Sequence, residues 1–205
     1  MRISFAAIFL TALLSGAVSA CAHELIPGVT GFPGEMLHPL LVPEFAASFI
    51  ACALLAGSAA RERFVFLAAI FIAGMVAGKG LLLIAPVVLQ LWYAPAICIL
   101  LAGLTVAALR PVPLVLAIVL ILALSFFVSV GLLPEGPGLA GLARSVAAYA
   151  LTGMILLIAL GYPLTLVKSQ WGGILVRVAG AWLAAVSILY LAYAWRIASG
   201  ALPAA

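Results

Sequence analysis

Residues 112–133 read VPLVLAIVLILALSFFVSVGLL, a predominantly apolar run without a charged side chain. A helix needs about 20 such residues to cross the roughly 30 Å of hydrocarbon in a bilayer. The run therefore predicts a transmembrane helix. Because similar runs recur along the chain, it also indicates that the whole chain is a membrane protein.

Further apolar runs of similar length lie on both sides of this one. The chain is 68% hydrophobic and 7% charged, with a mean hydropathy of +1.43, whereas a soluble domain has about 25% charged residues. The composition predicts an all-α, polytopic bundle of about six transmembrane helices, separated by short breaks that contain Pro, Gly or charge. Only the connection 134–144 is long enough to hold a small feature. The other predicted spans are 40–60, 64–86, 88–109, 145–167 and 174–197.

The amino terminus has the organisation of an export signal. Arg2 precedes the apolar stretch Ile3–Leu14, and small residues follow up to Ala22. We therefore assign residues 1–22 to a signal peptide and residues 23–205 to a single six-helix domain. Cleavage after Ala22, lipid attachment at Cys21 and retention as an uncleaved helix remain as alternatives.

The positions of the basic residues predict the orientation. If the signal is exported, alternate loops and helix ends on one side collect the basic residues, as the positive-inside rule requires for the cytoplasm. The mature amino terminus and the 134–144 connection then face the periplasm, and the protein resides in the inner membrane. The cytoplasmic basic residues are Arg61, Arg63, Arg110, Lys168 and Arg177.

Other classes of function have little support in the sequence. The net charge of +4 comes from nine Lys and Arg against five acidic residues, and these charges are scattered, so nucleic-acid binding is not expected. Three cysteines suggest no disulfide framework. No Ser/His/Asp arrangement or His-x-x-x-His motif suggests an enzyme. The expected partners are the lipid bilayer, a divalent metal ion and further copies of the chain.

The most informative stretch contains both histidines of the protein. His23 begins His-Glu-Leu, residues 31–34 read Gly-Phe-Pro-Gly, and residues 38–45 read His-Pro-Leu-Leu-Val-Pro-Glu-Phe. This pattern resembles the HupE/UreJ family, which has an export signal, a His-containing mature terminus and about six helices, the first with the motif H-P-x-x-G-x-D-H. The resemblance implies a permease or metal-delivery protein for nickel or cobalt. The alternative is a membrane scaffold or assembly partner with a degenerate metal site.

The chain departs from that motif at three positions. Val42 replaces Gly, Glu44 replaces Asp, and Phe45 replaces the second His. The family's second His-rich element, after the fourth helix, corresponds to residues 129–136, which contain no His and keep only a carboxylate, Glu135. The candidate metal ligands are therefore His38, Glu44, Glu135 and His23, and this set predicts weak, unselective metal binding.

Two ionisable residues, Glu44 and Lys79, lie inside predicted spans. Charge at this depth is costly and is usually paired, so the sequence predicts a structural ion pair between them. Glu24 and Glu35 are expected to be solvated at the surface. Small residues at 74–80 and 180–184 have the spacing that allows close helix approach.

Overall fold

The computed structural model describes residues 29, 31–84, 93–108, 111–132, 138–167 and 169–199. The chain divides into two units, Met1–Thr30 and Gly31–Ala205, and the fold below is that of the second. The predicted signal peptide lies outside the described residues, so its processing remains a prediction.

The described part of the second unit is helical and contains no strand, which confirms the predicted all-α class. The helices are α2 (Gly31–Leu41), α3 (Pro43–Ser58), η1 (Arg61–Arg63), α4 (Phe64–Ile84), α5 (Ala94–Ala108), α6 (Leu114–Gly131), α7 (Gly138–Leu156), η2 (Leu157–Gly161), α8 (Tyr162–Leu164) and α9 (Gln170–Ala198).

Several of these helices are long and apolar enough to cross a membrane, so the chain is a multi-pass membrane protein. α2 and α3 add a further span if this bent pair is counted as one, and α5, with 15 residues, is apolar but shorter. The four long spans are Arg61–Leu83, Leu114–Gly131, Gly138–Leu164 and Gln170–Arg196.

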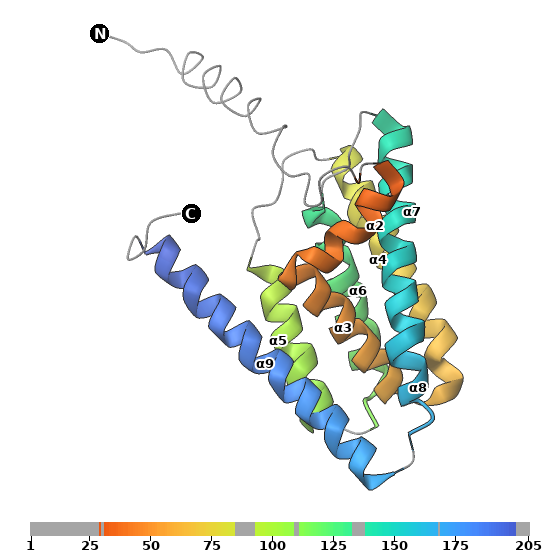
Figure 1. Cartoon of the computed structure of the whole chain (residues 1–205), viewed down its shortest axis with the longest axis vertical. Coiled ribbons are helices and arrows are strands. Elements are labelled where there is room, and N and C mark those ends of the chain that lie inside the picture. Colours follow the sequence, from red (N-terminus) through yellow and green to blue (C-terminus); the bar gives the residue numbers. More distant parts are fainter. Residues whose placement is uncertain are drawn as a thin grey trace. The chain divides into compact units, whose positions relative to one another are not determined.

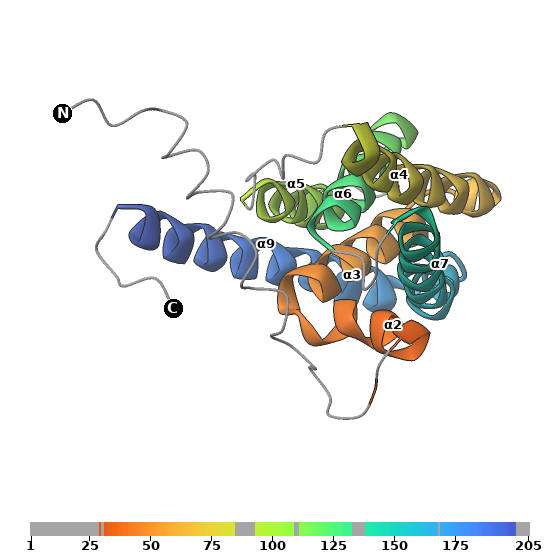
Figure 2. The same ribbon diagram turned by 90° about the horizontal axis from the view of Figure 1, so that it is seen from above.

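The helices pack in two rows beside each other (Figures 1 and 2). One row contains α5, α6 and α4, and the other contains α9, α3 and α7. α2 crosses beside α3 and α7 on the outer side of the second row. The buried core lies between the rows and includes Phe49, Phe71 and Leu124.

Proline explains the break between α2 and α3, whose axes differ by 82°. A residue before proline is pushed into extended backbone, and Val42, which precedes Pro43, has φ −94° and ψ 111°. Pro43 also has no N–H with which to continue the hydrogen bonds of α2, so a new helix begins there. The first predicted span, 40–60, therefore corresponds to α3 alone, and most of α2 lies before the predicted start of that span.

Glycine allows the closest helix contacts. A Cβ added to Gly74 of α4 would lie 2.8 Å from the carbonyl oxygen of Leu122 in α6, and one added to Gly78 would lie 2.5 Å from that of Phe126. Between the two rows, a Cβ added to Gly103 of α5 would lie 2.6 Å from the carbonyl oxygen of Gly180 in α9. The small residues seen in the sequence at 74–80 and 180–184 thus mark two helix interfaces.

Two predicted boundaries are corrected. α7 begins at Gly138 and continues through η2 and α8 to Leu164, so the 134–144 connection is shorter than we expected and Arg144 lies inside a helix. Gly138 has φ 71°, a left-handed conformation that glycine adopts without strain at this helix start. The last helix begins at Gln170, four residues before the predicted start at 174.

Candidate functional site

Two polar regions lie along the bent pair α2 and α3: one is centred on Glu35 of α2, and the other includes residues on both sides of the break. We call them the Glu35 cluster (Glu35, Lys79, Arg144, Ser145 and Tyr149) and the Glu44 site (His38, Glu44, Phe45 and Tyr190). The first collects charges from three helices, and the second joins the start of α3 to α9.

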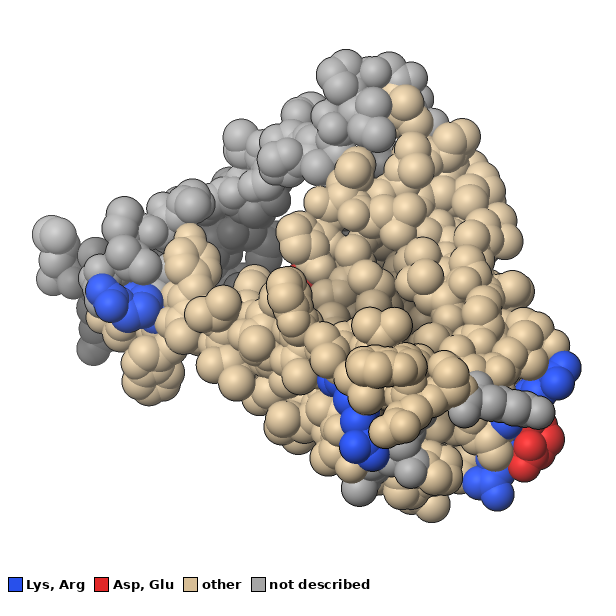
Figure 3. Space-filling view, turned by 60° about the horizontal axis from the view of Figure 1, so that its bottom comes forward, with Lys and Arg blue, Asp and Glu red and all other residues tan. Residues whose placement is uncertain are grey.

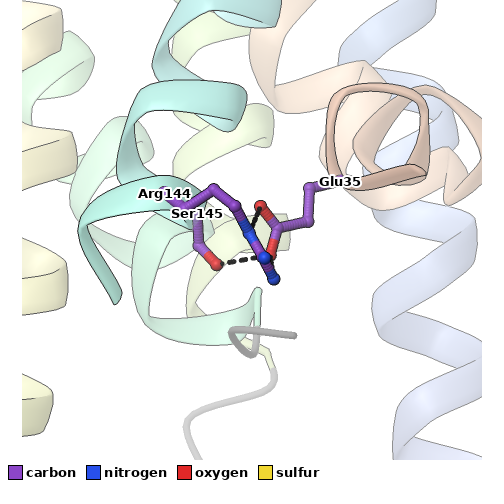
Figure 4. A network of polar contacts seen from close by, with 3 residues as sticks. All are labelled: Glu35, Arg144 and Ser145. Carbon is purple, nitrogen blue, oxygen red and sulfur yellow. Dashed lines mark hydrogen bonds and ion pairs between the residues drawn. The ribbon is translucent and has the colours of Figure 1, made fainter. Parts of the chain in front are cut away.

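The centre of the Glu35 cluster is a fully buried carboxylate. Glu35 of α2 points toward α7, where Arg144 and Ser145 contact it (Figure 4). Arg144 Nη2 lies 3.3 Å from Glu35 Oε1 and Arg144 Nε lies 3.4 Å from Oε2, while the Ser145 hydroxyl donates a hydrogen bond of 2.9 Å to Oε1. The expectation that Glu35 is a solvated surface residue is therefore wrong, because α2 folds back onto α7 and covers it.

Lys79 belongs to the same cluster. Its Nζ donates a hydrogen bond to the carbonyl of Leu132, at the C-terminal end of α6, where a cation is favoured by the helix dipole. The same Nζ lies 5.3 Å from the centre of the Tyr149 ring, and Lys79 is within electrostatic range of Glu35. Gly78 brings α4 close enough to α6 for this contact.

The Glu44 site lies just beyond the break. Glu44 is in the first turn of α3 and is partly buried, and the Tyr190 hydroxyl of α9 donates a hydrogen bond of 2.9 Å to its Oε2. Glu44 forms no ion pair with any residue that the structure describes. Its carboxylate thus has a neutral donor in place of a cation.

His38 lies on the other side of the break, in the last turn of α2. Its ring centre is 6.5 Å from that of Phe45, so the fold brings together the two positions at which the family motif has histidines. Phe45 cannot bind a metal, and the pair therefore offers one imidazole where the motif would supply two.

The predicted ion pair between Glu44 and Lys79 is absent from the described residues, in which each side chain has a different partner. Glu44 faces α9, whereas Lys79 faces the end of α6 and the Tyr149 ring of α7. The physical reason is helix rotation: similar depth in the membrane does not place two residues on facing sides of their helices.

The described residues include two of the four candidate metal ligands. His38 and Glu44 flank one break, but His23 and Glu135 lie outside the described residues. Within the described ranges, no three His, Cys, Asp or Glu side chains are grouped so that they could hold a metal ion. Among the described residues, the candidate ligands are thus one imidazole, His38, and one carboxylate, Glu44, whose partner is the Tyr190 hydroxyl.

Sequence reasoning missed Tyr190 and the burial of Glu35. Tyr190 lies within the last predicted span, 174–197, and nothing in its spacing identifies its partner 146 residues away. Glu35 did carry a signal: it precedes His38 by three residues, and this spacing places both on one face if the segment is helical.

Comparison with known proteins gives one result. The family model described as HupE / UreJ protein matches residues 11–190, which is most of the chain. No curated protein and no solved structure matches it. The match includes the His38-Pro39 element and all the spans up to most of α9, so this chain belongs to the HupE/UreJ family.

Proposed function

We propose that this protein is an inner-membrane permease or metal-delivery protein for a divalent transition metal such as nickel or cobalt. The ion would contact Glu44 and His38 at the break between α2 and α3. Broken helices are common at substrate sites of transporters, because the break leaves polar backbone and side chains inside the bundle. His23 and Glu135 remain candidates for further contacts.

The observation that carries the proposal is that Glu35 has a cationic partner, whereas Glu44 has none among the described residues. Glu35 has Arg144 as its ion-pair partner, whereas Glu44 has only the Tyr190 hydroxyl among the described residues. A charge inside a span that the protein does not neutralise is usually linked to a substrate path. Glu44 is therefore the carboxylate best suited to meet a cation from outside.

Metal uptake by cells expressing Glu44→Gln, compared with Glu35→Gln, tests the proposal. Both changes replace a carboxylate by an amide on the same bent span. Glu44→Gln should lower nickel or cobalt uptake about tenfold or more at an equal amount of folded protein, which is the order of effect expected when a metal contact is lost. Glu35→Gln should lower uptake only in proportion to any loss of folded protein.

One observation favours the scaffold as a second candidate. Phe45 occupies the position of the second motif histidine, and the described residues contain no group of three ligands. Calorimetric titration of the purified protein with nickel, cobalt, copper and zinc separates the two candidates. Weak binding that His38→Ala abolishes supports the metal path, and no binding of any ion, together with no uptake, favours the scaffold.

The orientation of the protein is part of the same proposal. We place the mature amino terminus and the start of α7 in the periplasm and η1 in the cytoplasm, since the basic residues follow this division. A single cysteine placed at Gly138 should react with an impermeant reagent added to intact cells, while one placed at Arg63 should not. The reverse result would invert the orientation.

A further inference from the structure

Lys79 is a buried cation, unlike the basic residues at the surface. In Figure 3, Lys and Arg side chains stand at separate places on a face that is otherwise almost without charge. Lys79 is only 1% exposed, although it lies in the long span Arg61–Leu83 and a lysine side chain can extend toward water. A buried ammonium is costly unless other groups replace its hydration. The groups around Lys79 therefore indicate what this position can hold.

Three groups from outside α4 surround the Lys79 Nζ atom. The carbonyl oxygen of Leu132, directly after α6, accepts its hydrogen bond, and the C-terminal end of a helix carries a partial negative charge. The Tyr149 ring of α7 has its centre 5.3 Å from Nζ, within the range of a cation–π contact. The fully buried Glu35 carboxylate of α2 is within electrostatic range. A carbonyl, an aromatic face and a carboxylate together suit an organic ammonium ion.

The groups around the ammonium are held by contacts that do not involve Lys79. Glu35 Oε1 accepts a hydrogen bond of 2.9 Å from the Ser145 hydroxyl and lies 3.3 Å from Arg144 Nη2. The backbone N–H of Leu132 donates a hydrogen bond of 3.0 Å to the preceding turn of α6. Removal of the lysine side chain should therefore leave these groups close to their present positions.

We propose that Glu35, Tyr149 and the Leu132 carbonyl form a binding site for a primary ammonium ion, and that the Lys79 side chain is its tethered occupant. The tether keeps the site filled, so Lys79 excludes other cations from Glu35. One consequence rests on the proposed function: if a metal ion passes Glu44, Lys79 prevents the same ion from binding at Glu35. The binding of an ammonium ion does not depend on that function.

The test removes the tether and supplies the ammonium ion in solution. Lys79→Ala deletes three methylene groups and the amine, which together correspond to propylammonium. The unfolding temperature of the full-length protein in detergent is measured with propylammonium chloride and with potassium chloride at equal ionic strength. If propylamine titrates like a lysine side chain, about one molecule in a thousand is neutral near pH 7.5, and this form can enter an apolar interior.

Propylammonium should stabilise the variant and not the wild type. Lys79→Ala should unfold at a lower temperature than the wild type in potassium chloride. Propylammonium at ten times its dissociation constant should raise the unfolding temperature of Lys79→Ala by about 4 °C. The wild type should not respond, because Lys79 fills its site. Propanol, which has the same carbon chain and no charge, should not stabilise Lys79→Ala.

Three further variants provide the controls. Met75→Ala opens a cavity one turn earlier on the same face of α4, where Met75 is fully buried, and it should lose stability without responding to propylammonium. Lys79→Met fills the space with an uncharged side chain and should not respond either. Glu35→Gln, added to Lys79→Ala, should weaken the apparent affinity for propylammonium about fivefold, because one charge interaction is lost.

A second measurement serves if Lys79→Ala does not fold alone. The variant is then produced and purified with propylammonium, and the yield of folded protein on size-exclusion chromatography should rise above the yield with potassium chloride.

Three results would overturn the proposal. These are the absence of any gain for Lys79→Ala with propylammonium, an equal gain for Met75→Ala, and an unchanged affinity after Glu35→Gln. Metal uptake through Glu44 is measured separately, so each of these results leaves the proposed function standing. A failure of the metal path would likewise leave the ammonium site in place.

Discussion

Glu35 and Glu44 lie on the same bent span, yet the protein treats their charges differently. Glu35 is fully buried and is neutralised by Arg144, with Ser145 and Lys79 close by. Glu44 is partly buried and receives only the Tyr190 hydrogen bond among the described residues. The comparison teaches that a carboxylate's partners, rather than its depth or its place in a motif, indicate whether it can receive a cation.

The charges around Glu35 suit a structural role. Arg144 pairs with Glu35 and Lys79 is within electrostatic range of it, so a divalent ion would meet two cations around one carboxylate. The cluster instead fixes α2 against α7, an interface that the Thr152 hydroxyl extends by donating a hydrogen bond of 2.8 Å to the carbonyl of Met36. We infer that the Glu35 cluster stabilises the packing of α2 against α7.

The largest expected effect is that of Arg144→Met. The substitution leaves a buried carboxylate without its ion-pair partner, and such losses cost about 3–5 kcal/mol. Because the Arg144 side chain is 41% exposed and Lys79 remains near, we expect about 2–3 kcal/mol here. Thermal unfolding of the protein in detergent measures it.

The double variant Glu35→Gln with Arg144→Met is the control. It removes the uncompensated charge, so it should unfold at a higher temperature than Arg144→Met alone. If Arg144→Met and wild type unfold at the same temperature, the Glu35–Arg144 pair does not stabilise the packing of α2 on α7. The structural role inferred for Glu35 is then wrong.

The second effect concerns the interface that positions Lys79. Gly74→Ala would force a Cβ against the backbone of Leu122 and the Ser125 side chain, and overpacking of this kind costs about 1–3 kcal/mol. Gly80→Ala on the same helix is the matched control, since no atom lies within 4 Å of its added Cβ. Unfolding temperatures should fall for Gly74→Ala and stay level for Gly80→Ala. If the two variants unfold at the same temperature, the close packing of α4 on α6 is not the feature that positions Lys79.

The sequence predicts the apolar spans well, because length and hydropathy alone decide whether a helix can cross a bilayer. It also contains the prolines that break the first span at Val42. It does not predict that α2 folds back onto α7, so Glu35 was assigned to solvent. The expected pairing of Glu44 with Lys79 used depth alone, and the rotation of each helix about its axis, which depends on packing against its neighbours, gave both residues other partners.

A third experiment tests which of the two carboxylates interacts with Lys79. In double-mutant cycles, Glu35→Gln with Lys79→Met should show a coupling energy on the order of 1 kcal/mol, since the two side chains are within electrostatic range. Glu44→Gln with Lys79→Met should show a coupling below about 0.5 kcal/mol. Unfolding free energies in detergent supply the values. A larger coupling for Glu44 than for Glu35 would restore the pairing expected from the sequence and contradict the contacts described above.

The smallest effect on stability, and the most direct test of the Glu44 site, is expected from Tyr190→Phe. The substitution removes one hydroxyl and leaves the ring, so the loss should be about 1 kcal/mol or less because Glu44 is only partly buried and water can replace the donor. Tyr190→Phe should affect metal uptake more than it affects the stability of the fold. Without the hydroxyl, the Glu44 carboxylate is no longer held toward α9, and the apparent affinity for nickel in uptake should change while the unfolding temperature stays nearly constant.

Tyr193→Phe, one turn further along α9 and half exposed, provides the control and should change neither quantity. If Tyr190→Phe and Tyr193→Phe give the same uptake as wild type, Tyr190 does not position Glu44 for the ion, and Glu44 must meet its cation without help from α9.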